Sequence, residues 1–183
     1  MIYQVSLHTA GIAVGVFLLL IGLAGLLRSK LCQTLATQLP RSRVAGVVLL
    51  GAAFAWSIWL LATMEMGEFS AFRRPLLIGL PIAFFLVLRF VDEFLAVRAL
   101  GILCLLAAEP LIEAAFLHYE MSRLVVTVFA YVLIVAGLFW VTMPYLLRDQ
   151  INWSVRSNLR WRFVSVIALL YGAASLALAI TQY

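Results

Sequence analysis

The stretch LVVTVFAYVLIVAGLFWVTMPYLL decides the fold. It covers Leu124 to Leu147, twenty-four residues without a charged side chain. A helix rises about 1.5 Å per residue, so roughly 20 apolar residues are enough to cross a hydrocarbon core of about 30 Å. Strands of a membrane barrel are about ten residues long and alternate in polarity, and this stretch does not alternate. Lipid offers no partner to backbone N–H and C=O groups, so the stretch is predicted to be a transmembrane helix.

Five further apolar segments lie on either side of it, and together they predict an all-α, polytopic membrane helix bundle. The predicted helices of this single domain, residues 1–183, are 9–27, 44–64, 75–91, 94–117, 124–147 and 163–182. The apolar pattern is weaker in the third and fourth, because Asp92 and Glu93 separate them and the fourth carries charges. A hairpin of two spans is the preferred interpretation, and a pair of short, partly interfacial helices is the alternative.

The composition agrees with a surface that faces lipid. Hydrophobic residues make up 66% of the chain and charged residues 11%, less than half the usual share of a soluble domain. The net charge is +5, but the basic residues flank the apolar runs, so contact with lipid headgroups explains them better than nucleic acid does. Cys32 and Cys104 form no CxxC pair, so thiol redox chemistry and a thiolate metal site lack support.

The distribution of basic residues predicts an orientation. Segments 28–43, 89–98 and 148–162 hold ten of the thirteen Lys and Arg residues, which places these segments in the cytoplasm and both termini outside. Segment 148–162 also contains two tryptophans and is predicted to lie at the headgroups. No Lys or Arg precedes Arg28, so the first apolar segment is expected to be a retained helix and not a signal peptide. The protein is therefore expected to be multi-pass, in the inner membrane if it is bacterial.

Two predicted helices carry small residues on one face, which lets helix backbones approach closely in lipid. These residues are Gly11, Gly15 and Gly22 in the first helix, and Ser165, Ala168, Gly172, Ser175 and Ala179 in the last. Internal packing of the bundle is the preferred interpretation. A docking face for another subunit, or for a second copy of the chain, is the alternative.

The charges of the fourth helix are the most unusual feature. Arg98 and Glu109 are eleven residues apart, almost three whole turns, so they share a face, and Glu113 follows one turn later. Their axial separation is about 16 Å, so at least one lies inside a hydrocarbon core of about 30 Å if the helix spans. Such residues are candidates for a polar pathway or a buried ion pair. The alternatives are that Glu109 only orients the bundle by pairing with an arginine, or that the helix tilts into the interface. Glu109 is predicted to face the bundle interior.

The sequence gives little support to an enzyme or a cofactor protein. Hydrolase, zinc-protease and phosphate-binding motifs are absent. His8 and His118 are expected at helix ends on the outer side, where polar anchoring is the preferred role and a metal or haem site with Glu120, Met64 or Met66 the alternative. No cofactor and no metal are expected.

Three functional hypotheses remain. The leading one is a non-catalytic accessory subunit of a membrane protein complex, since the chain is small, its loops are short and two helices carry small-residue faces. The second is a small transporter or an ion- or proton-conducting protein that uses the charged helix 94–117. The third is a membrane enzyme or a haem- or metal-binding protein.

Overall fold

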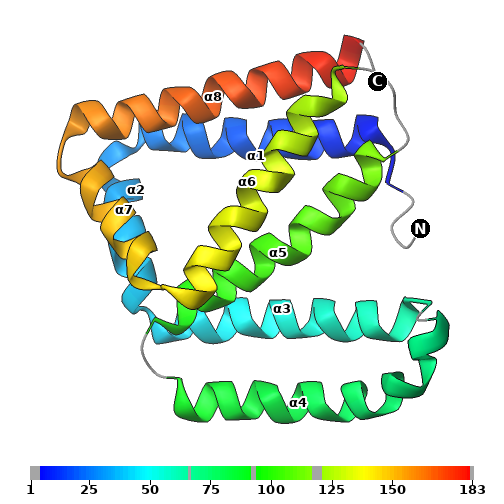
Figure 1. The fold of residues 1–183 in the computed structure, drawn as a ribbon. Helices are drawn as coiled ribbons and strands as arrows, with labels where there is room; N and C mark the ends of the chain where they lie inside the picture. Colours follow the sequence, from blue (N-terminus) through cyan, green and yellow to red (C-terminus); the bar gives the residue numbers. More distant parts are fainter. Residues whose placement is uncertain (1–4, 66, 92–93, 117–120, 182–183) are drawn as a thin grey trace.

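The computed structural model describes residues 5–65, 67–91, 94–116 and 121–181, and all the regular structure in these ranges is helical (Figure 1). Six of its helices are long and apolar enough to cross a membrane, which confirms the predicted set of six apolar helices. They are α1 (Leu7–Leu27), α3 (Arg43–Thr63), α4 (Arg73–Phe90), α5 (Leu95–Ala115), α6 (Arg123–Thr142) and α8 (Asn158–Thr181). The apolar segment of α4 begins in the preceding 3-10 turn η2 (Gly67–Phe72) and covers Ser70–Phe90.

Helix α6 ends five residues before the predicted boundary at Leu147. Met143 leaves the helical conformation, with φ −126° and ψ 72°. Pro144 follows it, and proline lacks the N–H that a continuing helix needs and disfavours a helical residue before it. Residues 145–147 instead begin the short helix α7 (Tyr145–Val155). The apolar run alone therefore extended the predicted helix across a break.

The spans form three neighbouring pairs (Figure 1). Helix α1 packs along α8, α5 along α6, and α3 against α4. Helix α5 also contacts α3 and so connects the hairpin of α3 and α4 to the other four spans. In the last pair Phe54 stacks on Phe84, with 4.4 Å between the ring centroids. Helix α4 has no buried residue, so this hairpin stands at the edge of the bundle.

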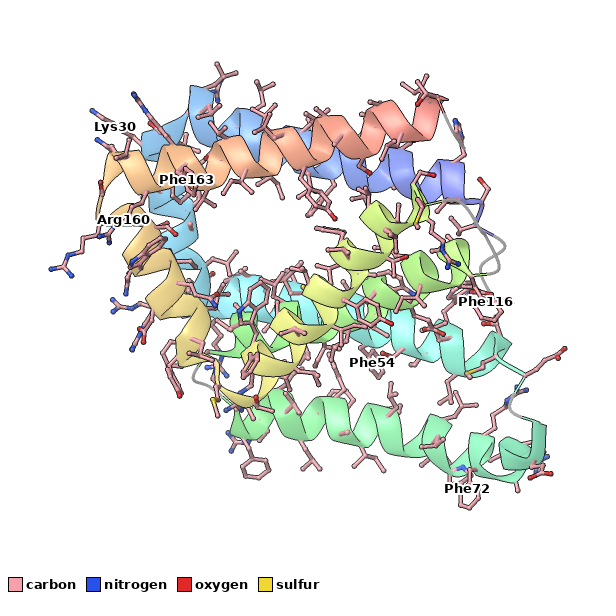
Figure 2. The ribbon with its side chains drawn as sticks, turned by 45° about the horizontal axis from the view of Figure 1, so that its top comes forward. Lys30, Phe54, Phe72, Phe116, Arg160 and Phe163 are labelled. Atoms are coloured by element: carbon pink, nitrogen blue, oxygen red, sulfur yellow. The ribbon has the colours of Figure 1, made fainter. Side chains whose placement is uncertain are left out.

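Two short polar helices close one end of the bundle. They are α2 (Ser29–Gln38), followed by the 3-10 turn η1 (Leu39–Arg41), and α7. Basic side chains gather at this end, where Figure 2 labels Lys30 and Arg160. The Arg160 guanidinium lies 4.9 Å from the centroid of the Trp153 ring, an arrangement typical of an interfacial segment. The termini lie at the opposite end (Figure 1).

Candidate functional site

The small residues of α1 and α8 face one another within the chain. Gly11, Gly15 and Gly22 are buried, as are Ser165, Gly172, Ser175 and Ala179, while Ala168 is half-buried. A Cβ atom added to Gly172 would stand 2.9 Å from the Gly15 carbonyl oxygen, so the two backbones touch. The Ser175 hydroxyl donates a hydrogen bond of 3.0 Å to the Gly11 carbonyl across this contact. These stripes are thus occupied by each other and offer no free face to a partner.

A second close approach, which the sequence reasoning missed, joins α5 to α6. A Cβ atom on Gly101 would lie 2.9 Å from the Gly137 carbonyl oxygen, and one on Gly137 would lie 2.8 Å from the Gly101 carbonyl oxygen. Each of these helices contains only this one glycine, so no stripe marked the contact in the sequence. The contact of these two glycines holds α5 close against α6. Helix α5 is the one that carries Arg98, Glu109 and Glu113.

Glu109 and Glu113 line a cleft of about 950 Å³ at the end of the bundle where the termini lie. We call it the carboxylate cleft. It lies between the end of α3 and one face of α5, and α6 contributes Ile134. Its lining residues are Thr63, Met64, Glu65, Leu105, Ala108, Glu109, Ile112, Glu113, Phe116 and Ile134. Phe116 is labelled at this end of the molecule in Figure 2.

Glu109 is exposed to this cleft and is not enclosed by the helices, which differs from the predicted interior position. Six residues separate it from the end of α5 at Ala115, so it lies about 9 Å along the axis from that end. In the part of the chain that the structure describes, no arginine forms an ion pair with Glu109. The fixed arginine partner expected of a purely structural carboxylate is therefore not found there.

The structure does not bring Arg98 to the same site. Arg98 lies in the first turn of α5, at the other end of the helix from the cleft, as the predicted separation of about 16 Å requires. Its Nε atom is buried and has no hydrogen-bond partner in the described residues. The shared face predicted from the spacing thus holds two separate features: the carboxylate cleft near the end of α5 and Arg98 in its first turn.

Glu65 is a cleft residue that the sequence reasoning missed. It follows the end of α3 and lines the same cleft as Glu109 and Glu113. Only the packing of α3 against α5 brings these carboxylates to one cleft, and no sequence spacing relates the two helices. Arg73 donates a hydrogen bond to the carbonyl of Met64, which places one cation beside the rim. Three carboxylates in one open cleft favour protons or cations over anions.

The outer polar residues do not form a metal site in the described ranges. His8 is exposed in the first turn of α1, and His118, Glu120 and Met66 lie outside the described residues. Within the ranges that the structure covers, no three His, Cys, Asp or Glu side chains gather closely enough to hold a metal ion.

The chain matches no protein-family model, no curated protein and no solved structure.

Proposed function

We propose that the chain is a multi-pass membrane protein with six spans and both termini outside, in the inner membrane if it is bacterial. Two observations support this topology. Six helices are long and apolar enough to span a membrane, and basic side chains gather at one end of the bundle, where α2 and α7 lie. Segments 28–43, 89–98 and 148–162 carry nine of the twelve arginines, and such residues retain a segment in the cytoplasm. The contact of the Arg160 guanidinium with the Trp153 ring at that end is consistent with a position at the lipid headgroups.

Reporter fusions test this orientation. A reporter that is active only outside the cytoplasm should be inactive when fused after Lys30 and active when fused after Gln182. The physical reason is that Lys30 lies at the basic end, whereas α8 ends at Thr181 at the other end of the bundle. Activity after Lys30, or its absence after Gln182, would contradict the model.

Within this membrane topology, the proposed role is a non-catalytic accessory subunit that binds a transmembrane helix of a partner protein on the α3–α4 hairpin. The observation that supports this role is the environment of the glycines. At most of the described helical glycines, among them Gly172 and Gly137, an added Cβ atom would lie within about 3 Å of an atom of another helix. Gly51 of α3 and Gly79 of α4 meet nothing within 4 Å. Small residues mark close helix contacts in lipid, and these two are unused by the chain itself.

Further support comes from the outer side of α4. Ile78 and Ile82 flank Gly79 on an exposed surface, with exposed fractions of 65% and 55%. No residue of α4 is buried, so a partner helix placed here would complete the packing of the one span that the chain leaves uncovered.

Photo-crosslinking in intact membranes tests the partner contact. A photoreactive side chain at position 78 or 82 should give an adduct with one protein of different mass. The same group at Leu170, which is 66% exposed in the middle of α8, should give adducts with lipid only. Gly79→Leu should remove the protein adduct, since its side chain would occupy the space of the partner backbone. Lipid adducts alone at 78 and 82, or an adduct between two copies of the chain, would contradict the proposal.

The carboxylate cleft supports one alternative, a small proton- or cation-conducting protein. The specific observation is that Glu109 faces an open cleft about 9 Å inside the end of α5 without an arginine partner among the described residues. An intramembrane carboxylate of this kind is typical of ion and proton pathways. Proton or cation flux through the protein in liposomes, lost in Glu109→Gln, is the experiment for this alternative.

A further inference from the structure

The basic end of the bundle contains a polar pocket of about 450 Å³. We call it the α2–α7 pocket. Gln38 at the end of α2, Arg41 of η1 and Ser42 form one wall, and Arg148 and Asn152 of α7 form the other. Elements that are far apart in the sequence thus bring two guanidinium groups, two amides and the hydroxyls of Thr37 and Ser42 to the same space.

Both arginines have N–H groups to offer to a ligand. Arg41 is exposed and has no ion-pair partner among the described residues. Arg148 contacts Asp149 through Nε and Nη2, each 3.0 Å from Oδ1. A guanidinium carries five N–H donors, so the second terminal nitrogen of Arg148 retains both of its own. Asp149 is 55% exposed and does not line the pocket, so the pocket itself keeps a positive balance.

Helix α3 begins directly after Ser42, which lines the pocket. The Ser42 hydroxyl oxygen accepts a hydrogen bond of 3.2 Å from the Ala45 N–H, which fixes it as the residue that caps this helix. The first N–H groups of a helix have no partner within it and carry the positive end of the helix dipole. Ser42 thus places the positive end of a twenty-one-residue helix beside the two arginines of the pocket, a charge distribution suited to a phosphate group.

The surroundings indicate where that phosphate comes from. Val44 and Val48 lie on the first two turns of α3 after Ser42 and are 76% and 65% exposed. A lipid whose phosphate occupies the pocket could lay its acyl chains along this apolar surface. A free phosphate would make no use of it.

We propose that the α2–α7 pocket binds a phosphate-bearing anion, and specifically the headgroup of an anionic phospholipid. Basic pockets at the cytoplasmic ends of membrane helices are suited to such headgroups. The inference depends on membrane insertion, but neither on a partner at α4 nor on transport through the carboxylate cleft. A bound lipid here would link α2, α3 and α7 and so stabilise the basic end of the bundle.

Lipid titrations of the purified full-length chain in neutral detergent test the site, with the melting temperature as the readout. Phosphatidylglycerol should raise the melting temperature, and phosphatidylcholine should not, because only the first carries a net negative charge. Arg41→Gln and Arg148→Gln should each weaken phosphatidylglycerol binding by about fivefold, from the loss of one basic contact. Arg162→Gln is the matched control, since Arg162 is an exposed arginine of α8 outside the pocket.

Each outcome decides the proposal. The Arg41 side chain has no hydrogen-bond or ion-pair partner among the described residues, so Arg41→Gln should keep the fold even if Arg148→Gln disturbs α7. An unchanged affinity in both pocket variants, an equal loss in Arg162→Gln, or no response of the wild type to phosphatidylglycerol would overturn the site. Stabilisation by inorganic phosphate but not by phosphatidylglycerol would overturn the lipid as its source.

Discussion

Gly172→Leu is expected to separate α1 from α8 and to remove most of the folded protein. The first added carbon would stand 2.9 Å from the Gly15 carbonyl oxygen and 2.9 Å from the Leu19 backbone nitrogen, closer than atoms of these kinds pack. Both neighbours are backbone atoms of α1, so no side chain can rotate away. Overpacking of this kind destabilises by about 3 kcal/mol, the upper end of the usual range. That is a large part of the stability of a typical domain.

Gly51→Leu is the matched control for this substitution. Gly51 also lies within an apolar helix, but an added Cβ meets nothing within 4 Å. Both variants therefore change the hydrophobicity and the helix propensity in the same way, and only one creates a collision. Size-exclusion profiles and melting temperatures of the purified chains check the prediction. Equal stability of the two variants would mean that the α1–α8 contact does not hold the fold together.

The comparison of sequence and structure shows which features periodicity can predict. The six apolar helices follow from the length of the uncharged runs, because lipid imposes the same length on every span. The stripe of α8 was visible because its small residues recur at helical spacing from Ser165 to Ala179. The contact of Gly101 with Gly137 was not visible, since one glycine on each helix forms no pattern.

Features that depend on which helices are neighbours could not be predicted. Glu65 reaches the carboxylate cleft only because α3 packs against α5. In the same way, Arg41 and Arg148 line one pocket because α2 and α7 lie at the same end of the bundle. The two arginines are more than a hundred residues apart in the chain. Arg98 and Glu109 lie about 16 Å apart along the axis of α5, as their spacing of eleven residues requires. The spacing does not show whether Glu109 faces another helix or an opening, because that depends on which helices pack against α5.

If the alternative function holds, Glu109→Gln is expected to abolish proton or cation flux through the reconstituted protein. The substitution keeps the size of the side chain and removes its capacity to carry charge. Glu68→Gln is the matched control, because Glu68 is an exposed carboxylate of η2 that does not line the cleft. It should retain most of the flux, since a group outside the spanning helix is not needed to cross the membrane core. Flux measured with a pH-sensitive or ion-sensitive dye inside liposomes checks both variants.

Thiol accessibility then separates this function from the accessory role. In a chain with Cys32→Ser and Cys104→Ala, a cysteine at position 109 should react with a charged, membrane-impermeant thiol reagent added outside. The reason is that the carboxylate cleft is open and Glu109 is exposed to it. A cysteine at Leu170, exposed on the middle of α8, should not react, because lipid and not water would cover it.

Reaction at 109 together with flux lost in Glu109→Gln would establish a conducting pathway. Reaction at 109 with no flux in the wild type would leave a wet cleft without transport and favour the accessory subunit. Protection of 109 would contradict the open cleft itself, and a partner helix seated over it would then have to be sought by crosslinking from that position.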